Sequence, residues 1–307
     1  MDNLLIIQPE VHDAIAEHRP VVALESTLIS HGLPAPLNLK CAHKAEAEIR
    51  TAGAVPATIA VIDGQIRVGL TDGELERLAE DDNVTKLSRD NLATAISQRS
   101  TGSTTVAASM ICAHSAGIPV FSTGGIGGVH RGWQNDLDIS ADLLELARTK
   151  VTVVCSGAKS LLDLPATLEF LETLGVPVIG LATEELPAFF SRESGLTLRQ
   201  KVRNVGEAAT IVANRHALGL QGGEVLAVPP PATTALAQSE VNQWIALAIN
   251  EARARNIHGN AVTPFLLERL AELSGGRTLT ANVALIEHNA AVAALFAIAR
   301  AAHTYSS

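Results

Sequence analysis

Two ionisable residues directly follow apolar segments that are typical of buried strands. Glu25 comes after the run Val21–Leu24, and Lys159 closes the turn after the β-branched run 151–155. Because the carboxyl ends of parallel strands open on one crevice, we expect both side chains to reach it. A carboxyl group that loses water on burial can transfer a proton near neutral pH. A lysine there can act as a nucleophile, provided that burial or a neighbouring cation such as Lys86 lowers its pKa.

Each of these residues also has an ordinary structural interpretation. Glu25 can cap a loop or pair with an arginine. Lys159 can stay solvated at the start of the helix that we expect at residues 160–174, although the positive end of the helix dipole disfavours a cation there. The two residues alone therefore leave the catalytic and the structural interpretations open.

A glycine-rich run lies between these residues in the chain. Residues 124–128 hold four glycines within five positions, which allows several backbone amides to point at one anion such as a phosphate. The run matches neither the dinucleotide-binding pattern nor the P-loop pattern. A tight loop with no ligand has the same composition, and His130 is equally consistent with a loop residue and with a catalyst.

Three aspartates follow the glycine-rich run. Asp136, Asp138 and Asp142 are hard oxygen donors without a nearby cysteine or histidine pair, so they suit Mg²⁺ or Mn²⁺ held partly through water, and not zinc. The alternative is helix capping, by Ser140 or Asp138, of a helix that begins near Ala141.

The pattern of the whole chain predicts an α/β fold. Short apolar runs alternate with helical periodicity, as in βαβ units that build a parallel sheet. We expect strands at 21–24, 118–122, 151–155, 176–181 and 224–228, a hairpin of 57–62 with 65–69, and helices at 39–52, 104–116, 160–174 and 205–218. The final helices, at 239–256, 263–273 and 279–302, should pack on the sheet. The expected architecture is one three-layer α/β/α domain over residues 1–307 with a mostly parallel central sheet and a helical C-terminal portion.

Composition narrows the classes of partner. Acidic residues outnumber basic ones, 32 to 23, and no basic stripe is present, which disfavours a nucleic-acid polymer. The apolar stretch near residues 290–299 is too short to span a bilayer, so no membrane is expected. The three cysteines are isolated in the sequence, as is typical of a protein of the reducing cytoplasm.

Taken in order, the motifs resemble those of the pseudouridine-5'-phosphate glycosidases. The resemblance extends over nearly the whole chain. It rests on ALESTLISHG (23–32), GAVPATIA (53–60), NVTK (83–86), STGGIGGVHRG (122–132), DISADL (138–143) and CSGAKS (155–160), with LPAFF (186–190), TPFLL (263–267) and LTANVAL (279–285) in later segments.

The resemblance implies a function and a set of site residues. It implies reversible cleavage of the carbon–carbon glycosidic bond of pseudouridine 5'-phosphate, with Lys159 as Schiff-base nucleophile and Glu25 as proton donor. It further implies Mn²⁺, or another divalent ion such as Mg²⁺, at Asp138, and a homotrimer. The predicted substrate contacts are Lys86, Val106, Ser140, Ala141, Asp142, Thr123, His130 and, in the uracil pocket, Asn282.

Two other functions fit the same residues. One is a different Schiff-base lyase, such as an aldolase, acting on a phosphorylated sugar. The other is a sugar-phosphate-binding protein without turnover, which ligand would stabilise against heat while no product forms. Release of free uracil separates the first prediction from both alternatives.

Overall fold

The structure is a computed structural model that describes residues 4–257 and 262–304. Its strands are β1 (Leu5–Ile7), β2 (Val21–Leu24), β3 (Val55–Ile62), β4 (Gln65–Val68), β5 (Thr85–Leu87), β6 (Gly102–Thr104), β7 (Val120–Ser122), β8 (Thr152–Cys155), β9 (Val178–Leu181), β10 (Gln200–Val202) and β11 (Glu224–Ala227). Its helices are α1 (Pro9–Ala16), the π-helix η1 (Leu28–Gly32), α2 (Leu37–Thr51), α3 (Asp72–Glu80), α4 (Leu92–Ser97), α5 (Val106–Ser115), α6 (Trp133–Asp136), α7 (Ala141–Arg148), α8 (Leu164–Thr173), α9 (Val205–Ala217), α10 (Gln238–Ala254), α11 (Val262–Leu273) and α12 (Arg277–Thr304).

The described strands form one mostly parallel sheet, as the sequence predicts. Its order is β1-β4-β3-β2-β7-β8-β11-β9-β10, and a short arm of β5 and β6 is attached to β3. The β3–β4 and β3–β6 pairings are antiparallel, and the other strand pairings are parallel. Because β2, β7 and β8 are adjacent and parallel, the loops after them emerge side by side at one edge of the sheet.

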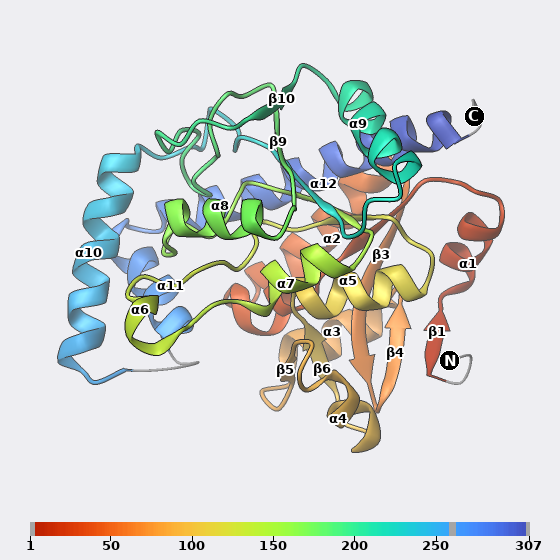
Figure 1. The fold of residues 1–307 in the computed structure, drawn as a ribbon. Helices are drawn as coiled ribbons and strands as arrows, with labels where there is room; N and C mark the ends of the chain where they lie inside the picture. Colours follow the sequence, from red (N-terminus) through yellow and green to blue (C-terminus); the bar gives the residue numbers. More distant parts are fainter. Residues whose placement is uncertain (1–3, 258–261, 305–307) are drawn as a thin grey trace.

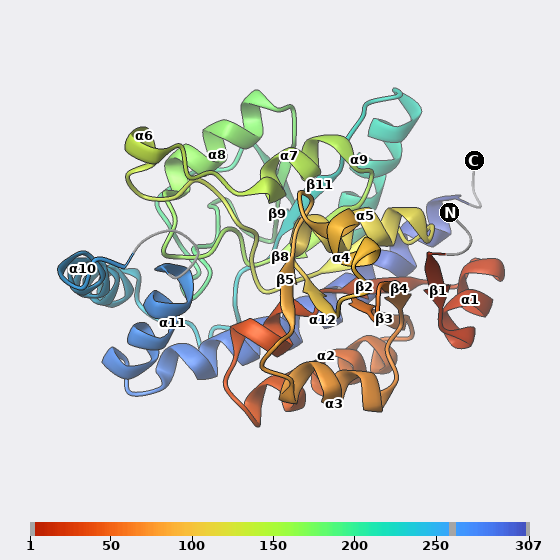
Figure 2. The same ribbon diagram turned by 90° about the horizontal axis from the view of Figure 1, so that it is seen from below.

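Both faces of this sheet are buried, and successive side chains along a strand point to opposite faces. Val21 and Ala23 of β2 belong to a core cluster that includes residues of α1, α5, α7 and α8. Val22 and Leu24 belong to a second cluster that includes residues of α2, α9 and α12. Strands buried on both faces are expected where helices cover both sides of a parallel sheet. This arrangement confirms the predicted three layers, and Figure 2 shows α5 and α7 on the side of the sheet opposite to α2 and α12.

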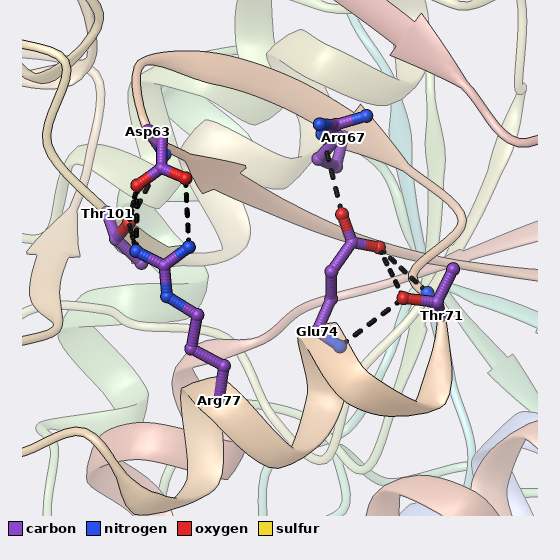
Figure 3. A network of polar contacts seen from close by, with 6 residues as sticks. All are labelled: Asp63, Arg67, Thr71, Glu74, Arg77 and Thr101. Atoms are coloured by element: carbon purple, nitrogen blue, oxygen red, sulfur yellow. Dashed lines mark hydrogen bonds and ion pairs between the residues drawn. The ribbon is translucent and has the colours of Figure 1, made fainter.

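The predicted hairpin at Asp63–Gly64 is present and is held by helix α3. Arg77 donates two parallel hydrogen bonds to the Asp63 carboxylate, of 2.9 and 2.7 Å (Figure 3). In the same view, Thr71 and Glu74 form a capping box at the start of α3. Both Asp63 and Gly64 have positive φ, as such a turn requires.

The long helix α12 crosses the sheet (Figure 1). Among the described helices it alone is long and apolar enough to cross a membrane, although 56% of its most apolar window is buried inside the protein. Ala290, Ala293 and Phe296 are buried, and the helix contacts β2, β7 and β8. Here the apolar face of α12 serves as core, and the expected packing of the C-terminal portion on the sheet is confirmed for this helix.

Some boundaries differ from those expected. The helix predicted to start at Ser160 starts at Leu164, because the Asp163 side chain caps it and Pro165 occupies its first turn. Thr104 belongs to β6, so α5 starts after the capping residue Thr105. The short elements β1, β5, β6 and β10 are absent from the prediction, since three-residue strands carry too little periodicity to be detected.

Candidate active site

A cavity of about 540 Å³ opens at the carboxyl ends of β2, β7 and β8. Glu25 follows β2, Thr123 follows β7, and Lys159 follows β8 after a turn of three residues. Most of the predicted site residues line this cavity: Glu25, Lys86, Val106, His130, Ser140, Asp142, Lys159 and Asn282. Residues far apart in the sequence therefore converge on one space, where parallel α/β sheets usually bind ligands.

Glu25 lines this cavity and is buried. Only 7% of its surface is exposed, and the Thr123 hydroxyl donates a short hydrogen bond to its Oε1. Burial raises the pKa of Glu25 above its usual range, while the positive charge of Lys159 and the Thr123 hydrogen bond lower that pKa in part. The arrangement produces a carboxyl group able to hold a proton in a site that also contains an amine. Thr123 itself acts on Glu25 and is not among the residues that line the cavity.

Lys159 is held by a tight backbone turn. Its N–H donates to the carbonyl of Ile126, 3.1 Å away, and its own carbonyl accepts from Leu162. Gly157 makes this turn possible, because its φ is +80° and a side-chain carbon there would lie 2.1 Å from the carbonyl oxygen of Pro187. The Lys159 side chain is partly buried.

A second lysine, Lys86, lines the same cavity as Lys159. Lys86 lies on the short strand β5. Its pKa is lowered below the usual range, mainly by burial and next by the positive charge of Lys159. The carboxylates of Glu25 and Asp142 act in the opposite direction on the same pKa. Two lysines and two carboxyl groups thus interact electrostatically around one cavity.

Asp142 has a scaffolding role that the sequence does not reveal. One oxygen accepts from the N–H of Ala107, at 2.9 Å, and the other from the N–H of Gly127, at 2.8 Å. A side-chain carbon at Gly127 would lie 2.2 Å from Ser140 Oγ, so only glycine fits. The expected capping of α7 is confirmed, because Ser140 Oγ accepts from the Asp142 N–H.

The glycine-rich run provides close backbone packing beside the cavity. Gly124, Gly125 and Gly127 line the cavity, yet the Gly127 amide already bonds to Asp142. Gly125 has a packing role, since a side-chain carbon there would lie 2.6 Å from the ring of Phe189. The tight loop predicted as one interpretation of this run is therefore present, and glycines of the run line the cavity.

Asn289 of α12 is a positioning residue that sequence reasoning missed. It is fully buried and donates to the carbonyl of Thr123, at 2.9 Å, while it accepts from the Ser156 hydroxyl, at 3.2 Å. It thereby joins the loops after β7 and β8, which carry Thr123 and Lys159. An asparagine directly before the apolar run 290–298 was the available signal, because a polar residue buried there must find partners.

Further residues of the cavity were also missing from the prediction. His31 lies on the π-helix η1, a rare conformation often found at functional sites. Burial, and then the charge of Lys86, lower the pKa of His31 below its usual range. Phe189 lines the wall with φ of +63°, an uncommon conformation for a bulky side chain.

Asp138 and Ala141 lie outside the cavity lining. The Asp138 side chain is half exposed, and its Oδ2 lies 3.6 Å from His130 Nδ1. Among the described side chains, no group of three or more His, Cys, Asp and Glu is arranged to hold a metal. One exposed carboxylate beside an imidazole still fits an ion whose other ligands are waters. The side chain of Asp136 lies outside the described residues.

Comparison with known proteins agrees with this geometry. The family model described as Indigoidine synthase A like protein matches residues 10–300. A solved structure of the prealnumycin C-glycosynthase AlnA in complex with ribulose 5-phosphate superimposes with a TM-score of 0.93 and 40% identity, covering 100% of both chains. An indigoidine synthase A-like protein from Thermotoga maritima gives 0.87 and 33%, covering 96% of both. The chain therefore belongs to the indigoidine synthase A-like family of α/β proteins.

Curated relatives make the assignment more specific. Proteins named pseudouridine-5'-phosphate glycosidase are 52% identical to this chain in Glaesserella parasuis, over 97% of this chain and 99% of theirs, and in Geobacillus kaustophilus, over 96% and 98%. This chain is a member of the pseudouridine-5'-phosphate glycosidase family, which confirms the resemblance seen in its motifs.

Proposed function

We propose that this protein cleaves pseudouridine 5'-phosphate reversibly into uracil and ribose 5-phosphate through a Schiff base on Lys159. The observation that carries the proposal is the convergence of Lys159 and a buried, protonatable Glu25 on one cavity. The names of the curated relatives and the sugar phosphate bound in the AlnA structure support it.

The bond to be broken explains why an amine is needed. C1' of the ribose is bonded to C5 of uracil, and a carbon leaving group has no lone pair that an acid can protonate. The paired-carboxylate route of ordinary glycosidases does not suffice here. An enzyme must first turn C1' into an electrophile and then turn C5 into a leaving group.

Glu25 and Lys159 supply these two steps. The uracil ring loses its N1 proton and pushes electrons toward C1', while Glu25 protonates the departing O4' and the ribose ring opens. The Lys159 amine then adds to C1', uracil regains its N1 proton, and the proton that the amine gives up after addition is delivered to C5. The C1'–C5 bond breaks to leave uracil and a C1'=N iminium, which one water hydrolyses to ribose 5-phosphate and free Lys159.

The remaining cavity residues bind and orient the substrate. Lys86 is proposed to bind the phosphate, Val106, Ser140 and His130 to contact the sugar, and Asn282 of α12 to contact the uracil. The proposal is supported because all five residues line the cavity. Fixing the phosphate holds C1' near the amine, which converts binding energy into orientation. Ala141 and Asp142 support this region from the start of α7.

A divalent ion, Mn²⁺ or Mg²⁺, is proposed at Asp138. The half-exposed carboxylate of Asp138 can hold it together with waters. When bound, the ion supplies positive charge that orders the polar groups at the rim of the site. Hard oxygen ligands favour these ions over softer ones.

We also propose how the protein assembles and where in the cell it acts. The protein acts as a homotrimer, as the family resemblance implies, and in the cytoplasm, which agrees with three free, buried cysteines. The continuous sheet from β1 to β10 supports a single domain over residues 1–307.

Product analysis tests the function. Purified protein is incubated with pseudouridine 5'-phosphate and Mn²⁺, and free uracil and ribose 5-phosphate are quantified by chromatography. Equimolar release of both is expected. Cleavage of other phosphorylated sugars without uracil release would support a different Schiff-base lyase. Thermal stabilisation by the nucleotide without any product would support a binding protein.

A further inference from the structure

The strand that carries Lys86 lies at the margin of the sheet. β5 pairs with β6 over three residues, and β6 pairs with β3 through two residues. The chain after β5 then forms part of the cavity rim, where Ser88, Asp90 and Asn91 line the opening. Figure 1 shows this arm beneath α5 and α7. So short a pairing leaves the strand locally weak, and other contacts must fix the position of Lys86.

Residues 86–91 are braced into one unit. The Asn91 side chain donates to the Lys86 carbonyl, at 3.0 Å, and accepts from the Ser88 N–H, at 2.8 Å. A contact made by any residue of this unit therefore also restrains Lys86.

Arg89 ties this unit to helix α7. Its Nη1 donates to Oε2 of Glu145, and the Thr149 hydroxyl donates to the other oxygen. Because the Glu145 side chain is only 1% exposed, the positive charge of Arg89 offsets the cost of burying its carboxylate. Glu145 lies three residues after Asp142, which bonds to α5 and to the glycine-rich run. The Arg89–Glu145 contact and the backbone of α7 therefore link the segment of Lys86 to Asp142, which also lines the cavity.

From these contacts we infer that the Arg89–Glu145 ion pair is a positioning clamp: it fixes Lys86 across the cavity and so sets the affinity for the phosphate of the substrate. This inference rests on the proposed function, because it takes Lys86 to bind that phosphate. Arg89 and Glu145 act through Lys86 and do not contact the reacting atoms.

The chain contains a matched control for this pair. Glu224 at the start of β11 is also 1% exposed, and it accepts from Arg215 Nε, at 3.0 Å, and from the Thr152 hydroxyl, at 2.9 Å. Because β8 and β11 are parallel and begin there, this second Arg–Glu–Thr cluster lies at the edge of the sheet opposite to the cavity. Its loss should affect stability without affecting substrate binding.

The experiment compares Arg89→Met with Arg215→Met by thermal melting and by steady-state kinetics. Both should lower the Tm, since each leaves a buried carboxylate without its cation. Only Arg89→Met should raise KM for pseudouridine 5'-phosphate, by about tenfold, with kcat nearly unchanged. The double variant Arg89→Met/Glu145→Met removes the buried charge, so its Tm should recover while its KM stays high. A KM in Arg89→Met equal to that of Arg215→Met would overturn the clamp.

A double-mutant cycle with Lys86→Met tests the route of the effect. If Arg89 acts through Lys86, then Arg89→Met should raise KM little further in the Lys86→Met background. An equal fold-increase in both backgrounds would contradict the inference. Should the wild-type protein release no uracil at all, the proposed function fails; if it releases uracil and the two arginine variants behave alike, only the clamp fails.

Discussion

The two edges of the parallel sheet hold cavities of similar size and different chemistry. At the carboxyl ends of the strands, a cavity of about 540 Å³ is lined by two lysines and several carboxyl groups. At the amino ends of β2 and β7, a cavity of about 450 Å³ is lined mostly by apolar residues, with His18, Arg19 and Arg300. No lysine or carboxylate is among the described residues that line this second cavity. Volume alone therefore does not identify an active site; the convergence of an amine with a protonatable acid does.

Buried glutamates at the two edges show the same contrast. At the amino end, Glu224 accepts from an arginine and a threonine, so its charge is directly compensated. At the carboxyl end, Glu25 accepts one hydrogen bond, from Thr123, among the described residues. Burial then dominates and raises the pKa of Glu25. One carboxylate serves stability, whereas the other is kept in an environment that favours its protonated form.

The largest expected effect is on kcat, in a comparison of the two lysines that flank β8 in the sequence. Lys159→Met should lower kcat by about four orders of magnitude or more, because the covalent step is lost. Lys150→Met, just before the same strand, is the control and should retain activity within about threefold. Uracil release measured for both variants checks the comparison, and substantial turnover by Lys159→Met would break it.

Glu25→Gln should lower kcat by about 10²- to 10⁴-fold, since a general acid is removed. In the wild-type protein the protonated acid is the active form, so kcat should fall as pH rises through the raised pKa of Glu25. A pH profile of kcat checks this, and the same alkaline limb in the glutamine variant would assign it to another group.

The stability of the folded protein should also depend on the protonation of Glu25. The pKa of Glu25 is higher in the folded protein than in the unfolded chain, so the folded protein binds more protons. As the pH rises from the unfolded-state pKa through the folded-state pKa, Glu25 therefore lowers the free energy of unfolding by an increasing amount. The Tm of Glu25→Gln relative to wild type should therefore increase between pH 5 and pH 8. A difference in Tm that does not change with pH would show that ionisation of Glu25 does not destabilise the folded protein.

Metal removal should have a smaller effect. Chelation with EDTA is expected to lower activity about tenfold, and added Mn²⁺ should restore it, because the ion orders the site without forming the covalent bond. Asp138→Asn should reproduce the loss and respond only weakly to Mn²⁺. Full activity after exhaustive chelation would show that the reaction does not need the ion.

The smallest effect concerns the thiols. Burial raises the pKa of Cys155, the last residue of β8, to about 12, and likewise that of Cys41 and Cys112. At pH 8 the native protein should react with a thiol reagent at least about a hundredfold more slowly than the denatured protein, and labelling should leave kcat unchanged. Fast labelling of Cys155 would indicate that the carboxyl edge of the sheet opens more readily than its packing indicates.

Sequence patterns predicted the parts of the fold that have a strong period. The runs that became β2, β8 and β11 and the long C-terminal helices were recognised, because burial on both faces or helical periodicity marks them. The arm of β5 and β6 was missed, although it carries Lys86, since its short strands depend on pairing partners far away in the chain.

The site was predicted unevenly for a related reason. Glu25 and Lys159 follow recognisable strands, so their convergence could be expected from the sequence. The hydrogen bonds of Asn289, Asp142 and Arg89 join residues 166, 35 and 56 positions apart, and no local pattern encodes such pairs. The roles proposed for the site residues, the bound ion and the trimer remain predictions.

Trapping of the covalent intermediate tests the central claim most directly. The protein is incubated with pseudouridine 5'-phosphate and sodium borohydride, digested and analysed by mass spectrometry. The account predicts a reduced ribose-phosphate adduct on the peptide that contains Lys159, dependent on substrate and absent from Lys159→Met. Uracil release without an adduct at Lys159, or an adduct on Lys86 instead, would contradict it.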